Sequence, residues 1–539
     1  MSWIRLPARA TVRKYLIKCC AAAAIAGAAN LMYPHCNVLY GSGSSGDTGN
    51  EVGIMSKSNE AKVSVQQAPA GEPLSEDYSV AVGGAAVPVY SCRVSAVPLD
   101  QVWPGYQRPM DQTELAAFAY CEAAGPVSVQ VTAQREIKSV VVRPLSRKIT
   151  PSVKGGQISF KVSGPGQLTV EVNGWHNALH LFINPPEQAA PGSDDPNVRY
   201  FGPGVHHPGK IVLESNQTVY VAAGAVVYGS ISAQKANNIR ILGRGIVDVS
   251  ESERGKGGGA IRLRDCADIT IDGLVLRDPD VWCCTLLGCR NAEISNVKCV
   301  GLWRYNSDGI DLCNSQDIHI RDCFVRAFDD CIVLKGLMGG GGRNSGVSFV
   351  DRPVRGILVE RCVIWNDWGR ALEIGAETST PEIADVVFRD CDIIRTDYIA
   401  MDIQHGHRAK VHDIRFENIR VEADDFNLRP VIQKTRDEKY VTDPKDDYRP
   451  YLMYIVIEPN SWSADPNHGV VRNVVFKDIT VTSKLFLPSR FQGLDAEHDV
   501  KGVTIENVRV NGRRCNNAEE AQLEIRPHVS DVTFVGGTK

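Results

Sequence analysis

The chain has 539 residues, a net charge of −4 at pH 7 and 43% hydrophobic residues. This length exceeds the usual size of one hydrophobic core, so we expect two or more domains. The lack of a basic excess argues against binding to nucleic acid or to an anionic membrane, because both need cations that neutralise phosphates. Abundant Gly and Val with few helical patterns favour an all-β chain.

Residues 1–35 have the features of an export signal. Five basic residues between Arg5 and Lys18 precede an Ala-rich apolar run, and Ala26-Gly27-Ala28 fits a cleavage site. The apolar run is short for a transmembrane helix, although an uncleaved anchor or an unrelated leader stays open. We therefore expect a secreted or periplasmic protein. Residues 36–75 are polar and rich in Gly and Ser, which predicts a disordered linker.

Residues 76–190 alternate apolar with polar side chains in short segments separated by Gly and Pro. Four such segments are 127–131, 137–142, 158–162 and 168–172. Period-2 strands at this spacing predict a small β-sandwich. None of its residues suggests catalysis.

Residues 191–539 contain a nine-residue repeat in which two apolar residues alternate with polar ones. Its second apolar position falls at residues 271, 294, 320, 359, 388, 416, 476, 505 and 534, in steps of 23 to 60 residues. Short strands at such a period cannot bury an apolar face alone, but they share one core when stacked in parallel. The repeat predicts a right-handed parallel β-helix, with long insertions near residues 336–353 and 424–454.

Several of the 16 cysteines recur at one position of the repeat, including Cys299, Cys323, Cys362 and Cys391. A ladder of this kind predicts small buried apolar side chains rather than disulfides. The chain has no C-x-x-C pair, and we expect neither a metal nor another cofactor.

Three aspartates stand out in the β-helix. Asp308 lies in the segment N-S-D-G-I-D, and the pair Asp329 and Asp330 lies in F-D-D-C-I-V-L-K, 21 residues later. If 21 residues make one coil, the three carboxyl groups lie on neighbouring strands about 4.8 Å apart. Like charges at this range raise at least one pKa, which yields a neutral acid beside an ionised base. A capping role in turns is the alternative for a single such segment.

These two segments, together with G-R-A-L-E-I-G from Gly369, resemble the motifs of glycoside hydrolase family 28, the polygalacturonase-like pectinases. The resemblance covers roughly residues 200–539. A β-sandwich before the β-helix is also similar to family 49, the dextranase and isopullulanase group. The resemblance implies an inverting glycoside hydrolase acting on a carbohydrate polymer or oligosaccharide.

Carried over to this chain, the resemblance implies that Asp329 is the general acid and that Asp308 and Asp330 activate water. Asn306 matches the Asn that supports the first aspartate. Two positions depart from the family pattern. Arg370 replaces the His of G-H-G, and residues 401–404 lack the R-I-K motif that grips a galacturonate carboxylate. Arg370 or Lys335 is then left to meet an anionic sugar, or the substrate is neutral or a decorated pectic side chain.

Further substrate-binding candidates lie next to the three acids along the predicted coils. They are Glu373, Gln404, His405, Trp303 and Trp368, and Tyr305 and Trp365 are additional aromatic candidates. Aromatic rings form platforms for sugars, although they also pack between coils.

Two other functions stay open at this point. A β-helix polysaccharide lyase needs an Arg or Lys base, a role for which Arg370 is the candidate. A non-catalytic carbohydrate-binding solenoid needs no acid at all. We expect a monomer without nucleic acid partners or stable membrane insertion.

Overall fold

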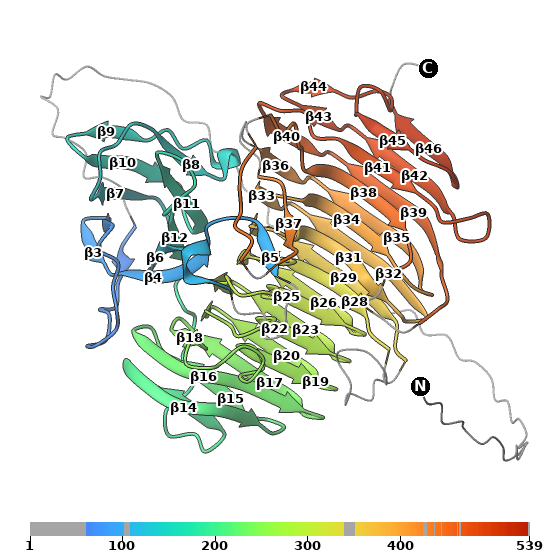
Figure 1. The fold of residues 1–539 in the computed structure, drawn as a ribbon. Coiled ribbons are helices and arrows are strands. Elements are labelled where there is room, and N and C mark those ends of the chain that lie inside the picture. Colours follow the sequence, from blue (N-terminus) through green and yellow to red (C-terminus); the bar gives the residue numbers. More distant parts are fainter. Residues whose placement is uncertain are drawn as a thin grey trace, which may run out of the picture. The chain divides into compact units, whose positions relative to one another are not determined.

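The computed structural model describes residues 61–536, except 102–107, 339–350, 424–427, 436, 444, 461, 463 and 464. The predicted leader and the first part of the predicted linker lie outside these residues. Residues 58–539 form one compact unit. Its described part is built almost wholly from strands (Figure 1), with two single 3₁₀ turns, η1 (Met110–Gln112) and η2 (Leu145–Arg147).

The strands of the N-terminal part form two mostly antiparallel sheets. The first contains β1 (Val63–Ser64), β6 (Thr113–Ala123), β12 (Leu179–Asn184), β11 (Gly166–Val172) and β8 (Val140–Arg143), with β4 (Val89–Ser95) beside β6. The second contains β3 (Ala85–Val87), β2 (Tyr78–Val82), β7 (Val127–Ala133), β10 (Gln157–Val162) and β9 (Ser152–Lys154). Apolar residues of both sheets share one core, as the period-2 pattern predicts for a β-sandwich.

Residues 61–75 depart from the predicted linker. The strand β1 pairs with β6, and Glu72 is buried with its carboxylate 2.7 Å from Arg277 in the β-helix. The Gly/Ser-rich composition that predicted disorder ends before this segment, whose apolar residues Val63 and Val65 pack against the sandwich core.

From β13 onward the chain winds into a right-handed parallel β-helix with three sheets. Sheet I contains β13 (Val198–Phe201), β15 (Thr218–Val221), β17 (Asn237–Gly243), β20 (Ala267–Asp272), β23 (Arg290–Ser295), β26 (Gln316–Arg321), β29 (Val354–Glu360), β32 (Glu382–Arg389), β35 (Lys410–Glu417), β39 (Val470–Lys477), β42 (Val500–Glu506) and β46 (Val529–Val535).

The other two sheets both start from β16 (Ala225–Gln234), which pairs with β14 (Gly204–Leu213). Sheet II contains β18 (Ile246–Asp248), β21 (Val275–Arg277), β24 (Lys298–Val300), β27 (Phe324–Ala327), β30 (Val363–Asn366), β33 (Asp392–Arg395), β36 (Arg420–Ala423), β40 (Thr480–Ser483) and β43 (Arg509–Val510), which also pairs with β44 (Arg513–Arg514). Sheet III contains β19 (Ile261–Arg264), β22 (Cys284–Leu287), β25 (Ile310–Cys313), β28 (Ile332–Gly336), β31 (Arg370–Thr378), β34 (Ile399–His405), β38 (Tyr451–Ile457), β41 (Ser489–Gln492) and β45 (Leu523–Ile525).

The nine-residue repeat sets the register of sheet I. Its second apolar positions pair directly from strand to strand, from Ile271 through Phe416 to Phe534. The residue that opens each repeat has a positive φ, for example Asp268 at 57° and Asp413 at 57°. Asn, Asp and Gly tolerate this conformation best, which explains why these residues recur there.

The cysteine ladder lies inside the β-helix. Cys299, Cys323, Cys362 and Cys391 are buried in its apolar core, and all described cysteines are free thiols. The prediction of buried structural cysteines is confirmed.

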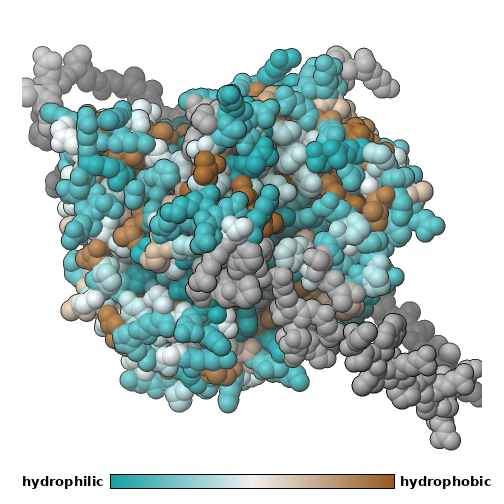
Figure 2. Space-filling view, viewed as in Figure 1, coloured by the Kyte–Doolittle hydropathy of each residue, from teal (hydrophilic) through white to brown (hydrophobic). Residues whose placement is uncertain are grey.

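The surface in Figure 2 is mainly hydrophilic, with hydrophobic residues in small groups. Within the described ranges, we find no helix with the length and apolar character needed to cross a bilayer.

Candidate active site

The three aspartates lie just before two adjacent strands of sheet III. Asp308 precedes β25 by two residues, and Asp330 precedes β28 by two residues. The Gly309 amide donates to the Asp330 carbonyl at 2.8 Å, which stacks the two turns directly. A Cβ on Gly309 would lie 2.4 Å from the Cys331 carbonyl oxygen, so only glycine allows this approach.

Lys335, from the end of β28, joins the acids. Its Nζ lies 2.8 Å from Asp308 Oδ2, 3.2 Å from Asp311 Oδ1 and 3.6 Å from Asp330 Oδ2. The Trp282 ring covers the ammonium group, with its centroid 4.3 Å away. The structure thus brings together Asp308 and Asp330, which are 22 residues apart and in register on neighbouring coils, as expected for acids one coil apart.

Arg370 approaches Asp330 from the next coil. Its guanidinium lies 3.5 Å from Asp330 Oδ1 and 3.5 Å from Asp402 Oδ2, and it donates to Gln404 Oε1 at 2.6 Å. The Tyr398 ring lies below it at 5.2 Å. Glu373 Oε1 is 3.9 Å away. Both cations of the site are therefore engaged by side chains of the protein itself.

The carboxyl groups of the three aspartates differ in the direction of their pKa shifts. Burial, together with the neighbouring Asp330 and Asp100, raises the pKa of Asp329 well above its usual value. Burial also acts on Asp330, but Lys335 and Arg370 outweigh it and lower the pKa of that carboxyl. Burial raises the pKa of Asp308 despite its contact with Lys335. A carboxyl with a raised pKa thus lies directly beside one with a lowered pKa, which favours a neutral acid next to an ionised one.

More carboxyl groups surround the trio than the two cations can balance. Burial raises the pKa of Asp311 to about 6 and of Asp402 to about 8, and it raises that of Glu373 as well. Asp311 shares Lys335 with Asp308 and Asp330, and Glu373 and Asp402 share Arg370 with Asp330. Buried carboxyls that share too few cations are costly, and they gather at functional sites.

Asp329 is held by the turn before β31. Asn366 Nδ2 donates to the Asp329 carbonyl at 2.7 Å, and the Trp368 ring stacks on Phe328 with centroids 5.8 Å apart. A Cβ on Gly369 would lie 2.7 Å from the Asp329 carbonyl carbon. The predicted G-R-A-L-E-I-G block thus packs against the general-acid candidate.

Most of the predicted substrate-binding residues lie at this cluster or border it. Lys335, Arg370, Glu373 and Gln404 lie within it, and the partly exposed Trp368 borders it. Asn306 has a φ of 55° and accepts a hydrogen bond from Arg254.

His405 and Trp303 lie elsewhere, which corrects their prediction as substrate contacts. Side chains alternate along β34, so that Asp402 and Gln404 face outward while Ile403 and His405 face the core. His405 is fully buried and shares a 2.8 Å hydrogen bond with Thr378. Trp303 is buried and donates to Asp278 at 2.8 Å. Tyr305 and Trp365 are also fully buried.

The β-sandwich contributes residues that the sequence gives no signal for. The strand β5 (Leu99–Gln101) leaves the sandwich and pairs in parallel with β37 (Val431–Gln433) from the second insertion (Figure 1). Arg108 donates to the Leu99 carbonyl at 2.8 Å and lies 3.9 Å above the Phe328 ring. This two-stranded ribbon, β5 with β37, therefore packs beside Asp329.

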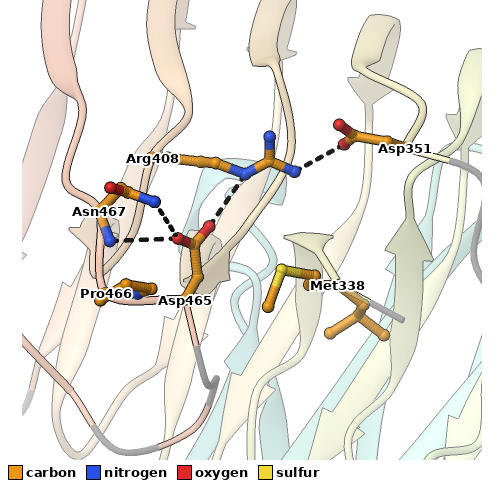
Figure 3. Close-up of a pocket in the computed structure, with 7 residues that line it drawn as sticks. Met338, Asp351, Arg408, Asp465, Pro466 and Asn467 are labelled. Carbon is orange, nitrogen blue, oxygen red and sulfur yellow. Dashed lines mark hydrogen bonds and ion pairs between the residues drawn. The ribbon is translucent and has the colours of Figure 1, made fainter. Parts of the chain in front are cut away.

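A separate pocket of about 450 Å³ lies beyond the opposite end of β28. Figure 3 shows Arg408 between Asp465 and Asp351, at 2.9 and 2.8 Å. Leu337, Met338, Pro466 and Asn467 complete its wall, and it contains none of the predicted site residues. Among the described residues, no group of His, Cys, Asp or Glu side chains is arranged to hold a metal ion.

Residues 204–440 match the family model described as "Glycosyl hydrolases family 28". The resemblance to family 28 is thereby confirmed for this part of the chain. The matched residues include the three aspartates, Lys335, Arg370 and Gln404.

Curated relatives of the chain include a "Probable rhamnogalacturonase A" from Aspergillus oryzae. It is 25% identical over 158 residues, which are 29% of this chain and 30% of the relative. A "Rhamnogalacturonase A" from Aspergillus aculeatus is 24% identical over 170 residues, 32% of this chain and 34% of the relative. The chain thus matches only about a third of the length of these relatives.

The fold is similar to that of "Dex49A from Penicillium minioluteum". The TM-score is 0.53 at 16% identity, and the match covers 87% of this chain and 97% of that structure. At this identity the likeness concerns the fold alone.

Proposed function

We propose that the chain is a glycoside hydrolase that cleaves a pectin-like or related glycan with inversion of the anomeric carbon. The observation that carries the proposal is the contrast between neighbouring acids, Asp329 with a raised pKa and Asp330 with a lowered one. Such a pair supplies a proton donor and a proton acceptor at the same pH.

In the proposed mechanism, Asp329 gives its proton to the glycosidic oxygen as the bond to the anomeric carbon breaks. Asp330 takes a proton from the water that attacks the opposite face of the sugar. Asp308 lies beside Asp330, across the Lys335 ammonium group, and orients that water. Asp330 is the base of this pair, because burial keeps the pKa of Asp308 raised.

The glycan class follows from the relatives and from the cations. The relatives named rhamnogalacturonase favour a pectic substrate. Lys335 and Arg370 are paired with carboxyl groups of the protein, which favours a neutral glycan as the second candidate. A polymeric substrate agrees with the predicted export, which stays a prediction, as does the monomeric state.

The test compares Asp329→Asn and Asp330→Asn with Asp317→Asn on a panel of pectic and neutral polysaccharides. Asp317 lies nearby in sequence, but it is exposed on sheet I. Loss of a general acid or base costs about 100- to 10,000-fold. We expect reducing-end release to fall by at least about 100-fold in the first two variants and to be unchanged in the third.

Wild-type rates for either site variant, with the fold checked by circular dichroism, would refute the mechanism. Products that absorb in the ultraviolet would show a lyase instead. If the wild type hydrolyses no glycan and Asp329→Asn binds glycan as well as the wild type does, the chain is a carbohydrate-binding solenoid. The raised pKa values of Lys335 and Arg370 disfavour the lyase, because a catalytic base must lose its proton.

A further inference from the structure

The outer face of sheet III is closed over the catalytic coils. One outward row crosses the strands in register, with one residue from each of six coils. The first five residues of the row are 0% exposed and the sixth is 8% exposed: Thr285, Asp311, Val333, Glu373, Asp402 and Tyr454.

This row lies beside the acids, three residues after Asp308 and Asp330 along the chain, so a polymer that crossed the strands at the acids would border it. Neighbouring strands are about 4.8 Å apart, close to the length of one sugar unit along a chain. A glycan that runs through an open cleft would therefore contact consecutive members of the row. Their burial leaves no continuous track of accessible surface across these coils.

The accessible side chains are interrupted at the acids: Trp282 is partly exposed on one side of Asp308, and a short rim surrounds Arg370 on the other side. Arg370 keeps 15% of its side chain exposed, and Trp368, Tyr398 and Gln404 are partly exposed around it. By contrast, Asp308, Asp329 and Asp330 are each exposed by at most 6%. The acids thus lie beneath a rim rather than along a groove.

The ribbon of β5 and β37 forms one wall of this rim. Trp368 Nε1 donates to the Val431 carbonyl of β37 at 3.1 Å, and Arg108 fixes β5 over Phe328, the residue before Asp329. Arg108 is itself buried, and it also lies 4.6 Å above the Tyr305 ring. These contacts hold the wall against the turn that carries the acid.

We infer that this site binds the end of a glycan chain in a pocket and releases short products, rather than cleaving the chain internally. The inference rests on the proposed function and specifies its substrate as a chain terminus. The rim of Trp368, Arg370, Tyr398 and Gln404 would contact the terminal sugars, and the ribbon would block passage of the chain past Asp329.

The first test follows the full-length protein on a polysaccharide that it hydrolyses, with viscosity and product size measured at low conversion. We expect one short product from the first time point, with little loss of viscosity. A mixture of intermediate lengths with a rapid loss of viscosity would overturn the inference but leave the hydrolase intact. Failure to hydrolyse any polysaccharide or oligosaccharide would overturn the proposed function and this inference together.

A second test does not depend on turnover. The Asp329→Asn variant is mixed with fractions of the same polysaccharide of increasing length, and the bound protein per chain is measured by sedimentation. A pocket for termini predicts saturation at one or two proteins per chain at every length. A number of bound proteins that grows in proportion to length would show an open groove, and would overturn the inference.

Discussion

Asp329 and Asp330 are adjacent in sequence, but their pKa values shift in opposite directions because their side chains meet different partners. Asp330 lies within 4 Å of both Lys335 and Arg370, whereas no cation is paired with Asp329 among the described residues. Lys335 and Arg370 lower the pKa of Asp330, and the neighbouring Asp330 carboxyl raises the pKa of Asp329. These interactions separate the pKa values of the two buried acids. The chemistry of the site thus depends on Lys335 and Arg370 as much as on the aspartates.

Replacement of Arg370 tests this dependence. Hydrolysis requires ionised Asp330, so the rate falls as the pH drops through the pKa of that carboxyl. The Arg370→Gln substitution removes a charge that lowers this pKa. We expect the acidic limb of the kcat profile to move to higher pH. The exposed Arg355→Gln substitution serves as the control, and an unmoved limb would argue against Asp330 as the base.

Asp402 gives a second residue-scale prediction. Its pKa is about 8 in the folded chain and near 4 when unfolded, so the folded state holds more protons between these values. Stability contributed by this group is present below about pH 4 and is lost as the pH rises through 8, by up to about 1.4 kcal/mol per pH unit. We expect Tm to fall less steeply from pH 5 to 9 in Asp402→Asn than in the wild type. Parallel curves would contradict the raised pKa.

Part of the site could be predicted from the sequence. The spacing of 22 residues between Asp308 and Asp330 corresponds to one coil, which places them side by side. Residue alternation along β34 would have assigned His405 to the core. Arg108 and Asp100 reach the site through tertiary packing of the sandwich. No local pattern encodes such a contact, so they could not have been found.

At the scale of the elements, the β-helix is held together by stacks of identical side chains. Phe388, Phe416 and Phe476 stack on successive strands of sheet I, with ring centroids 5.0 and 5.1 Å apart. Sheet I was predictable because its repeat alternates apolar with polar residues. Sheets II and III were harder to predict. Their outward faces also contain buried residues, so apolar and polar residues do not alternate along these strands.

Phe416 lies in the middle of this stack, so its replacement tests how much the stack stabilises the β-helix. We expect Phe416→Ala to destabilise the protein by about 3–5 kcal/mol, because it opens a cavity between two rings. The measurement is the midpoint of denaturant unfolding, with Val441→Ala as the control, since Val441 is 83% exposed. A midpoint equal to that of the control would show that the coils do not depend on the stack.

At the scale of the whole compact unit, buried ion pairs join the sandwich to the β-helix. Arg143 of β8 lies 2.9 Å from Glu171 of the sandwich and 2.6 Å from Glu422 of β36. Gln167 of β11 donates to Asn296 at 3.0 Å, and His180 of β12 contacts Arg326 of β27 at 3.3 Å. These contacts hold the sandwich in the position from which β5 reaches the site.

Removal of Arg143 leaves two buried carboxyl groups without their cation. Breaking a buried pair in this way costs about 3–5 kcal/mol. Burial raises the pKa of Glu422 to about 7, so this carboxyl can take up a proton at lower pH. We therefore expect Arg143→Met to lower Tm more at pH 8 than at pH 5.5. The exposed Arg147→Met is the control, and an equal loss at both pH values would contradict the account.

The most direct test of the central claim is the stereochemistry of the first product. Proton NMR of a hydrolysis started with fresh enzyme shows the anomer before mutarotation. A neutral Asp329 acting with an ionised Asp330 on water predicts that the inverted anomer appears first. Release of the retained anomer would show a covalent intermediate, and would contradict the roles given to the three aspartates.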